Sequence, residues 1–339
     1  MKKILLALVV LIIAGSAFYF ISSKPSSTPG SNNPASVEKP ADNAVVWKPA
    51  ESNPYMLLKN VKFRYTDDVF VNIHDLLGQS EPNKPNKYVD MNDVTTFTIH
   101  VLSAQCSLVP EVMGTLFNKY VLNYEGAPLK DMKISIVETE IDGQKVPMLK
   151  TSGKMKMVVW VPFEMTSRIG VDRATNCMTI DAEKVSSMGF PYLKKIMDVS
   201  PIKLENLLSI APGRGLFIKG NTLYVEAVNI TPPPKMRGNI LDVKVNAKNN
   251  CVDLKIGETN PPNIEYSLLV PDAKNYMYIF KGDVIFGKNL SSDGRLQLID
   301  TDPSDYLDYY LRKYLKQMEK GVIHMREDAS LVVDIGDYE

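Results

Sequence analysis

The stretch 153–165 constrains the fold more than any other part of the chain. Every second residue in it is apolar from Met155 onward, whereas Lys154, Lys156 and Glu164 occupy alternate positions. Because side chains alternate between the two faces of a β-strand, this pattern predicts one strand with an unbroken apolar face. Its other face is solvated, which is typical of a strand in an antiparallel sheet.

Two amphipathic helices are predicted to cover that apolar face, over residues 190–199 and 201–210. Ser200 is placed to cap the second helix, with Pro201 at its first position. Another one-sided strand is predicted at 178–182. The sequence therefore predicts an α+β fold, in which a long twisted antiparallel sheet wraps on amphipathic helices.

Further elements are predicted from the same periodicities. Apolar residues at helical spacing predict a helix over 108–122, and a second helix is expected to begin at Asp302 and to end near Glu319. Alternating segments separated by turn residues predict hairpins and single strands. These segments are 61–65 with 69–73, 95–102, 132–140 with 146–150, 216–219 with 222–227, 239–246 with 251–256, 276–280, 284–286, 296–298 and 329–335.

The amino-terminal residues 1–23 predict a transmembrane signal-anchor. Lys2 and Lys3 precede an uncharged run of about 20 residues, enough to cross a bilayer as a helix. The lysines favour an amino terminus in the cytoplasm and a folded part on the periplasmic side of a bacterial inner membrane. A cleaved signal peptide is the alternative, because small residues at 15–17 offer a cleavage site.

Residues 24–55 are rich in proline and serine and are predicted to be a linker. The folded part is expected to follow as an α+β core domain over residues 56–257. Strands and a helix in 258–339 are expected to complete that same domain.

Composition and motifs exclude several functions. The chain has 39 basic and 39 acidic residues, whereas nucleic-acid-binding domains usually have a basic excess. Cys106, Cys177 and Cys251 lack metal-binding spacing, although any two of them could form a disulfide. Neither a nucleophile motif nor a phosphate-binding loop is present. We therefore expect no catalytic residue, no metal, no cofactor and no nucleic-acid partner.

Charged residues near the predicted carboxy-terminal helix have two interpretations. Asp300, Asp302, Asp305 and Asp308 either bind a cation or belong to a helix start, which the following Pro303 favours. Basic and tyrosine residues farther along the helix either form a solvated face or meet anionic lipid headgroups. The basic residues are Arg312, Lys313, Lys316 and Lys320.

The chain has 16 methionines, and several share the apolar face described above. Flexible thioethers can line an adaptable apolar cavity, so a lipid or other apolar ligand is predicted between the sheet and the helices. The alternative is a dry core in an envelope scaffold or protein-interaction domain. The predicted lining residues are Met155, Met157, Val159, Val161, Phe163, Met165, Met178, Ile180, Leu193, Ile196, Met197, Leu204, Leu207 and Leu208.

Several short stretches carry a resemblance to known proteins. They are 126–129 (GAPL), 161–163 (VPF), 231–234 (TPPP) with Gly238, 275–278 (NYMY), 286–288 (FGK) and 299–303 (IDTDP). With them, the chain from residue 56 resembles a family of uncharacterised bacterial envelope proteins that are anchored or secreted. The element order over 131–256 is also similar to bacterial tubular lipid-binding (TULIP-like) domains. That likeness implies a hydrophobic tunnel for a phospholipid or another acyl ligand, without residue-level assignments.

Overall fold

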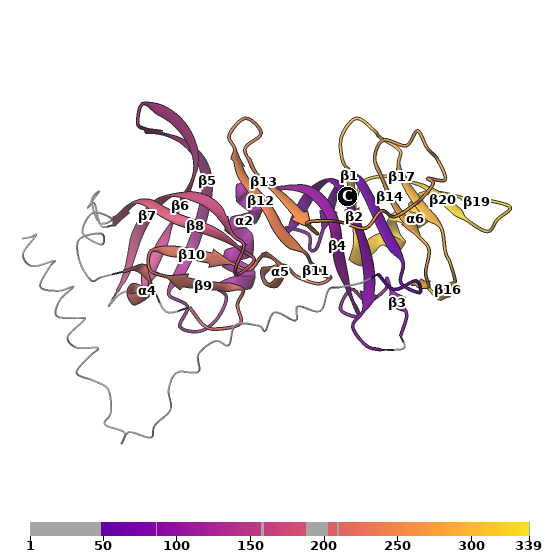
Figure 1. The fold of residues 1–339 in the computed structure, drawn as a ribbon, viewed down its shortest axis with the longest axis horizontal. Helices are drawn as coiled ribbons and strands as arrows, with labels where there is room; N and C mark the ends of the chain where they lie inside the picture. The colour runs from indigo at the N-terminus through magenta and orange to yellow at the C-terminus, as the bar shows by residue number, and fades with distance from the viewer. Residues whose placement is uncertain (1–48, 86, 157–158, 188–202, 209, 339) are drawn as a thin grey trace, which may run out of the picture. The chain divides into compact units, whose positions relative to one another are not determined.

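The structure is a computed structural model that describes residues 49–338, except residues 86, 157–158, 188–202 and 209. These residues belong to one compact unit that starts at Pro49. The buried apolar side chains described in it lie between Tyr55 and Ile335. Strands account for most of its regular structure (Figure 1).

The largest sheet has 11 strands, and the first strand of the unit lies in its middle. Strand β1 pairs antiparallel with β2 and β14 and parallel with β18, which places Val61 opposite both Ile73 and Leu307. Val61 and Leu307 are fully buried there. The main order is β12 (Asn239–Asn246), β13 (Cys251–Gly257), β4 (Phe97–Leu108), β2 (Phe70–Pro82), β1 (Tyr55–Arg64), β14 (Tyr276–Phe280), β17 (Leu296–Asp300), β20 (Leu331–Ile335) and β19 (Val322–Met325), with β11 (Lys235–Arg237) beside β4 and β18 (Leu307–Tyr310) beside β1.

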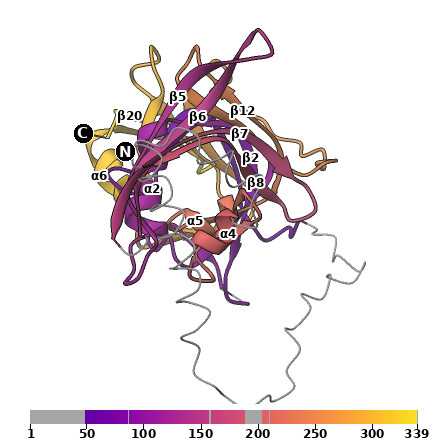
Figure 2. The same ribbon diagram turned by 90° about the vertical axis from the view of Figure 1, so that its left-hand side faces the viewer.

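A second sheet has six strands, and Figure 2 shows its strands β5 to β8 as a curved layer. Asp142 and Gly143, both at positive φ, form the tight turn of its first hairpin. A small sheet of three strands contains β16 (Asn289–Ser291), β15 (Val284–Phe286) and β3 (Val89–Asp90). The six-stranded order is β5 (Leu129–Ile141), β6 (Gln144–Lys156), β7 (Trp160–Asp172), β8 (Cys177–Ser187), β10 (Thr222–Val225) and β9 (Leu216–Lys219).

The described helices are short. Helix α2 (Pro110–Leu116) begins with proline, whose missing N–H costs nothing in a first turn, and passes directly into the π-helical turn η1 (Phe117–Val121). Helix α2 lies close to β5, because a Cβ on Gly114 would be only 3.4 Å from the Met132 carbonyl oxygen. The others are α4 (Leu204–Leu207), α5 (Ala227–Ile230), η2 (Leu311–Lys313) and α6 (Tyr314–Lys320).

The predicted fold class is wrong. A sheet wrapped on long amphipathic helices, as in a TULIP-like α+β fold, is contradicted by a described unit that consists mostly of strands in several sheets. The helix predicted from Asp302 to about Glu319 is confirmed only in its second half, where η2 and α6 are helical over 311–320. Its first half is wrong, since strand β18 occupies 307–310 and Asp302 accepts a hydrogen bond from Ser304 N in a turn (3.1 Å). Burial of Leu307 and Tyr309 against β1 outweighs the helix-start signal.

The predicted single strand over 153–165 is also wrong, because it is divided between β6 and β7. The antiparallel register places Met155 opposite Val161, so inward-facing positions keep the same parity on both strands. The alternation therefore continues through the reversal without a break in the pattern. Val159 lies at the reversal with 63% of its side chain exposed.

The predicted hairpins within 61–73, 132–150, 216–227 and 239–256 are confirmed, as is the helix over 108–122. The predicted helix at 190–199 and the predicted signal-anchor lie outside the described residues. The helix predicted at 201–210 is reduced to the single turn α4 in its described part. No helix among the described residues is long and apolar enough to cross a membrane.

Candidate apolar ligand site

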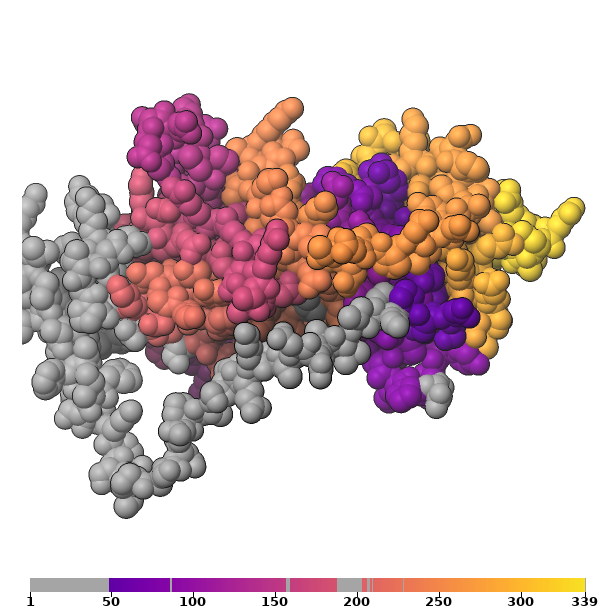
Figure 3. All heavy atoms as spheres, in the orientation of Figure 1, coloured from indigo at the N-terminus to yellow at the C-terminus, as the bar shows by residue number. Residues whose placement is uncertain are grey.

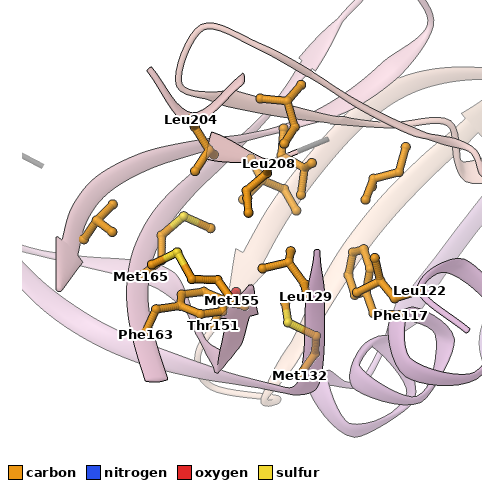
Figure 4. Close-up of a pocket in the computed structure, with 15 residues that line it drawn as sticks. Phe117, Leu122, Leu129, Met132, Thr151, Met155, Phe163, Met165, Leu204 and Leu208 are labelled. Atoms are coloured by element: carbon orange, nitrogen blue, oxygen red, sulfur yellow. The ribbon is translucent and has the colours of Figure 1, made fainter. Parts of the chain in front are cut away.

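A cavity of about 50 Å³ lies on the inner side of the six-stranded sheet, and we name it cavity 1 (Figure 4). Every strand of that sheet contributes to its wall, together with η1 and α4. Thr151 is the one polar side chain among the 15 residues that line it. The wall can therefore exclude water but offers almost no hydrogen bond to a bound molecule.

The structure brings six of the predicted lining residues together at this cavity. Figure 4 shows Leu204 and Leu208 on one side of it and Met155, Phe163 and Met165 on the other. The sixth residue is Ile180 on β8.

The remaining predicted residues are not among the described lining. Val161 and Met178 are buried in the core beside cavity 1 without lining it. Val159 is exposed, so its prediction as a lining residue is wrong. Leu207 belongs to α4, but its side chain is not described. Met157, Leu193, Ile196 and Met197 lie outside the described residues.

Sequence reasoning missed much of the wall of cavity 1. Phe117 was recognisable as a core residue of a helix, but nothing in the sequence indicated that this helix meets the six-stranded sheet. The contact is made at Met132, within a register shift in β5 between Lys130 and Lys133 that periodicity does not reveal. The other missed residues are Leu122, Leu129, Met132, Thr151, Val185, Leu216, Ile218 and Leu223.

Asn118 fixes the position of Phe117 in the wall. Its side-chain amide donates to the Met132 carbonyl oxygen (2.8 Å), and its amide oxygen accepts from Met132 N (2.9 Å). The hydrogen bond from Leu122 N to Phe117 O (2.8 Å) closes the wide π-helical turn. The turn is thereby tied to β5, and Phe117 is held at cavity 1.

A second cavity of about 90 Å³, cavity 2, lies under the large sheet. Its wall includes side chains from β2, β4, β11, β12 and β13, and from α2 and α5. Leu116 lines cavity 2, whereas the next residue, Phe117, lines cavity 1. The junction of α2 and η1 therefore contributes to the walls of both cavities. No sequence signal predicted cavity 2, because its residues come from distant segments.

Four residues with polar side chains line cavity 2, namely Tyr65, Cys106, Thr231 and Arg237, and the first two are only weakly polar. The Tyr65 hydroxyl donates to the thioether sulfur of Met236 (3.2 Å), and burial raises the pKa of Tyr65 well above its ordinary value. Burial also raises the pKa of the Cys106 thiol to about 12, with Asp75 and Asp253 adding to the effect. Both groups therefore remain protonated and neutral near pH 7.

Cys106, Cys177 and Cys251 are all free thiols. Asp308, one of the four aspartates considered above, accepts from Arg64 Nε (2.5 Å) and pairs with Lys62 Nζ (2.7 Å). Among the described residues, His, Cys, Asp and Glu side chains nowhere form a group of three or more suited to a metal ion. No family model, curated protein or solved structure matches the chain.

Proposed function

We propose that the protein binds an apolar ligand, a single acyl chain, in cavities 1 and 2. The observation that supports this best is the pair of apolar cavities that share the α2–η1 junction in their walls. Apolar cavities of this kind stay dry and accept apolar molecules, because water gains no hydrogen bonds there. The proposed function is therefore binding, without a catalytic step.

The size of the cavities favours one chain over a whole phospholipid. Volumes of about 50 and 90 Å³ are below the roughly 150 Å³ of an engineered cavity that binds benzene. A ligand therefore enters only if side chains move aside. Met132, Met155 and Met165 line cavity 1, and their unbranched thioether side chains can adopt new rotamers at low cost.

We also propose that the protein works at the periplasmic side of a bacterial inner membrane, held by residues 1–23. Lys2, Lys3 and the apolar run after them support this placement. A linker of about 30 residues spans on the order of 30 Å when flexible, so the folded unit can reach the bilayer surface. Acyl chains would then be available at the site of action.

The proposal is tested by measuring what the purified full-length chain carries. Mass spectrometry of solvent extracts should find acyl compounds at a fixed ratio to protein. Ala104→Leu fills cavity 2 and Val185→Phe fills cavity 1, because both residues line those cavities. Each variant should lower the ratio at least several-fold. Dodecanoic acid should raise the melting temperature of the wild type and have less effect on the variants.

Val332→Leu is the matched control, because Val332 is a buried core residue in β20 that lines neither cavity. It should retain the wild-type ratio. Lipid adsorbed to the apolar amino terminus would be the same in all variants, so only cavity-bound ligand responds to the substitutions. A wild type with no bound acyl compound and no response to dodecanoic acid would refute the proposal.

A second candidate function is protein binding through β19. This strand ends the order of the large sheet, and Val322, Ile323 and Met325 on it are 57%, 55% and 76% exposed. Figure 3 shows its hairpin with β20, in yellow, projecting at one end. An exposed apolar edge strand can accept a strand from another chain. Light scattering should detect an assembly that Ile323→Lys abolishes and Val185→Phe preserves.

A further inference from the structure

One end of the six-stranded sheet presents apolar and basic side chains together. Val159 is 63% exposed and Trp160 is 37% exposed, where β7 begins. The Lys130 ammonium lies 4.3 Å from the centre of the Trp160 ring. Lys154 and Lys156, near the end of β6, are also exposed. We name these five residues the tip patch.

The register explains why these side chains gather. Lys130 pairs with Lys154 and Lys156 pairs with Trp160, so they share the outer face of the sheet. The inner face at the same positions carries Met155, which lines cavity 1. The tip patch is therefore the outer surface of the wall that closes this end of cavity 1.

The charge of the tip patch is positive. It contains three lysines, and the carboxylate described beside them is Asp131, which pairs with Lys154 Nζ at 2.9 Å. The hydrogen bond from Lys154 lowers the pKa of Asp131, so Asp131 stays ionised at neutral pH. Lys130 contacts the Trp160 ring, and neither it nor Lys156 has a described carboxylate partner, so both can attract an anionic surface.

We propose that the tip patch docks on the surface of a bilayer that contains anionic lipids. Trp is enriched at membrane interfaces, where its ring sits at headgroup level, and lysines beside it meet lipid phosphates. Two apolar side chains are too few for the core of a stable protein–protein interface, which uses roughly 20–30 residues on each side. They are sufficient to enter a headgroup layer beside three cations.

The chain offers a direct reporter for this proposal. It has two tryptophans, Trp47 and Trp160, so the full chain with Trp47→Phe reports from the tip patch alone. It is reconstituted in vesicles of phosphatidylcholine with increasing phosphatidylglycerol, with bromine-labelled acyl chains as the quencher. Trp160 emission should shift to shorter wavelength and be quenched as phosphatidylglycerol increases. The emission should recover in 1 M salt, where electrostatic attraction is screened beyond about 3 Å.

Variants separate this contact from tethering by the amino-terminal segment, which is the same in every sample. Lys130→Gln, Lys154→Gln and Lys156→Gln combined should weaken docking on phosphatidylglycerol vesicles by at least about fivefold, because each lysine near an anionic surface contributes roughly a factor of five to the binding constant. Val159→Asp should reduce quenching without unfolding, since Val159 is exposed.

The matched control replaces Lys244, Lys248 and Lys255 of the β12–β13 hairpin by glutamine, and it should behave as the wild type. Trp160 quenching that is equal in pure phosphatidylcholine and in phosphatidylglycerol-rich vesicles would overturn the proposal. A tip patch that docked on an acidic protein instead would give that same null result with lipids. The outcome is independent of whether the cavities hold a ligand.

Discussion

Two consecutive residues face two different cavities. Leu116 ends α2 and lines cavity 2, and Phe117 starts the π-helical turn and lines cavity 1. A π-helical turn contains an extra residue per hydrogen-bonded ring, which changes the direction of the side chains that follow it. Asn118 locks this turn to Met132 at both polar atoms of its amide. Removal of the Phe117 side chain should therefore change the wall of cavity 1.

Phe117→Ala should enlarge cavity 1 and lower the free energy of unfolding by about 3–5 kcal/mol. Phe97→Ala, at a buried residue of β4 that lines neither cavity, should cost a similar amount. Urea unfolding with and without benzene distinguishes the two. Benzene should restore more stability to Phe117→Ala, because its cavity joins an existing one. Equal recovery in both variants would contradict the assigned position of Phe117.

Cys106 should make stability depend on pH in the alkaline range. Its pKa is raised from the ordinary 9.0 to about 12 in the folded protein, so the unfolded chain loses the proton first. The contribution of Cys106 to the free energy of unfolding is therefore fully present below pH 9.0 and is lost as the pH rises toward 12. Urea midpoints over this range should fall less steeply for Cys106→Ala. Cys251→Ala should remove a smaller part of the slope, because its folded pKa is about 11.

At the scale of elements, local signals predicted hairpins more accurately than the bounds of helices. Asp142-Gly143 identifies its hairpin because a tight turn needs residues that tolerate positive φ. In contrast, the segment 302–319 carries a proline and an acidic first turn, which are typical of helices. Leu307 and Tyr309 in this segment are nevertheless buried in a strand beside β1, and the paired residues Val61 and Leu307 are 246 positions apart in the sequence. Four cavity 1 residues followed from strand alternation, and Leu204 and Leu208 followed from helical spacing. Cavity 2 depends on contacts that no local pattern contains.

A substitution at Gly257 tests how closely strands β13 and β4 of the large sheet approach each other. Gly257 has a φ of +148°, and a Cβ there would collide with the Leu102 carbonyl group. Gly257→Ala should therefore lower the free energy of unfolding by more than the roughly 1–2 kcal/mol of left-handed backbone strain. Gly126→Ala is the control, because Gly126 has a φ of +83° and open space around it. Chemical unfolding should show the larger loss for Gly257→Ala.

At the scale of the whole described unit, an asparagine in the turn between β7 and β8 forms a hydrogen-bonded joint between two sheets. The Asn176 side chain donates to Gly238 O (3.0 Å) and accepts from Ile240 N (2.7 Å) at the start of β12. Its own φ of +53° is one that asparagine tolerates better than most residues. The joint therefore depends on both the conformation and the amide of one residue.

Asn176→Ala should leave Gly238 O and Ile240 N without this partner and cost about 1–3 kcal/mol. Amide hydrogen exchange should become faster in β7, β8 and β12, while β14, β17 and β20 remain protected. Asn246→Ala is the control, because Asn246 also makes two hydrogen bonds but keeps them within the β12–β13 hairpin, to Asp253 and Asn249. Faster exchange across the entire unit would contradict a local joint between the sheets.

The central position of β1 sets an order of events during synthesis. Its neighbours β14 and β18 are made more than 200 residues later, which takes roughly 10–40 s at 5–20 residues per second. The six-stranded sheet is built entirely from 129–225 and can assemble within that interval. Until residues 276–310 emerge, β1 keeps an open edge that can capture other nascent chains. A ribosome that stalls before residue 276 therefore releases a chain prone to aggregate.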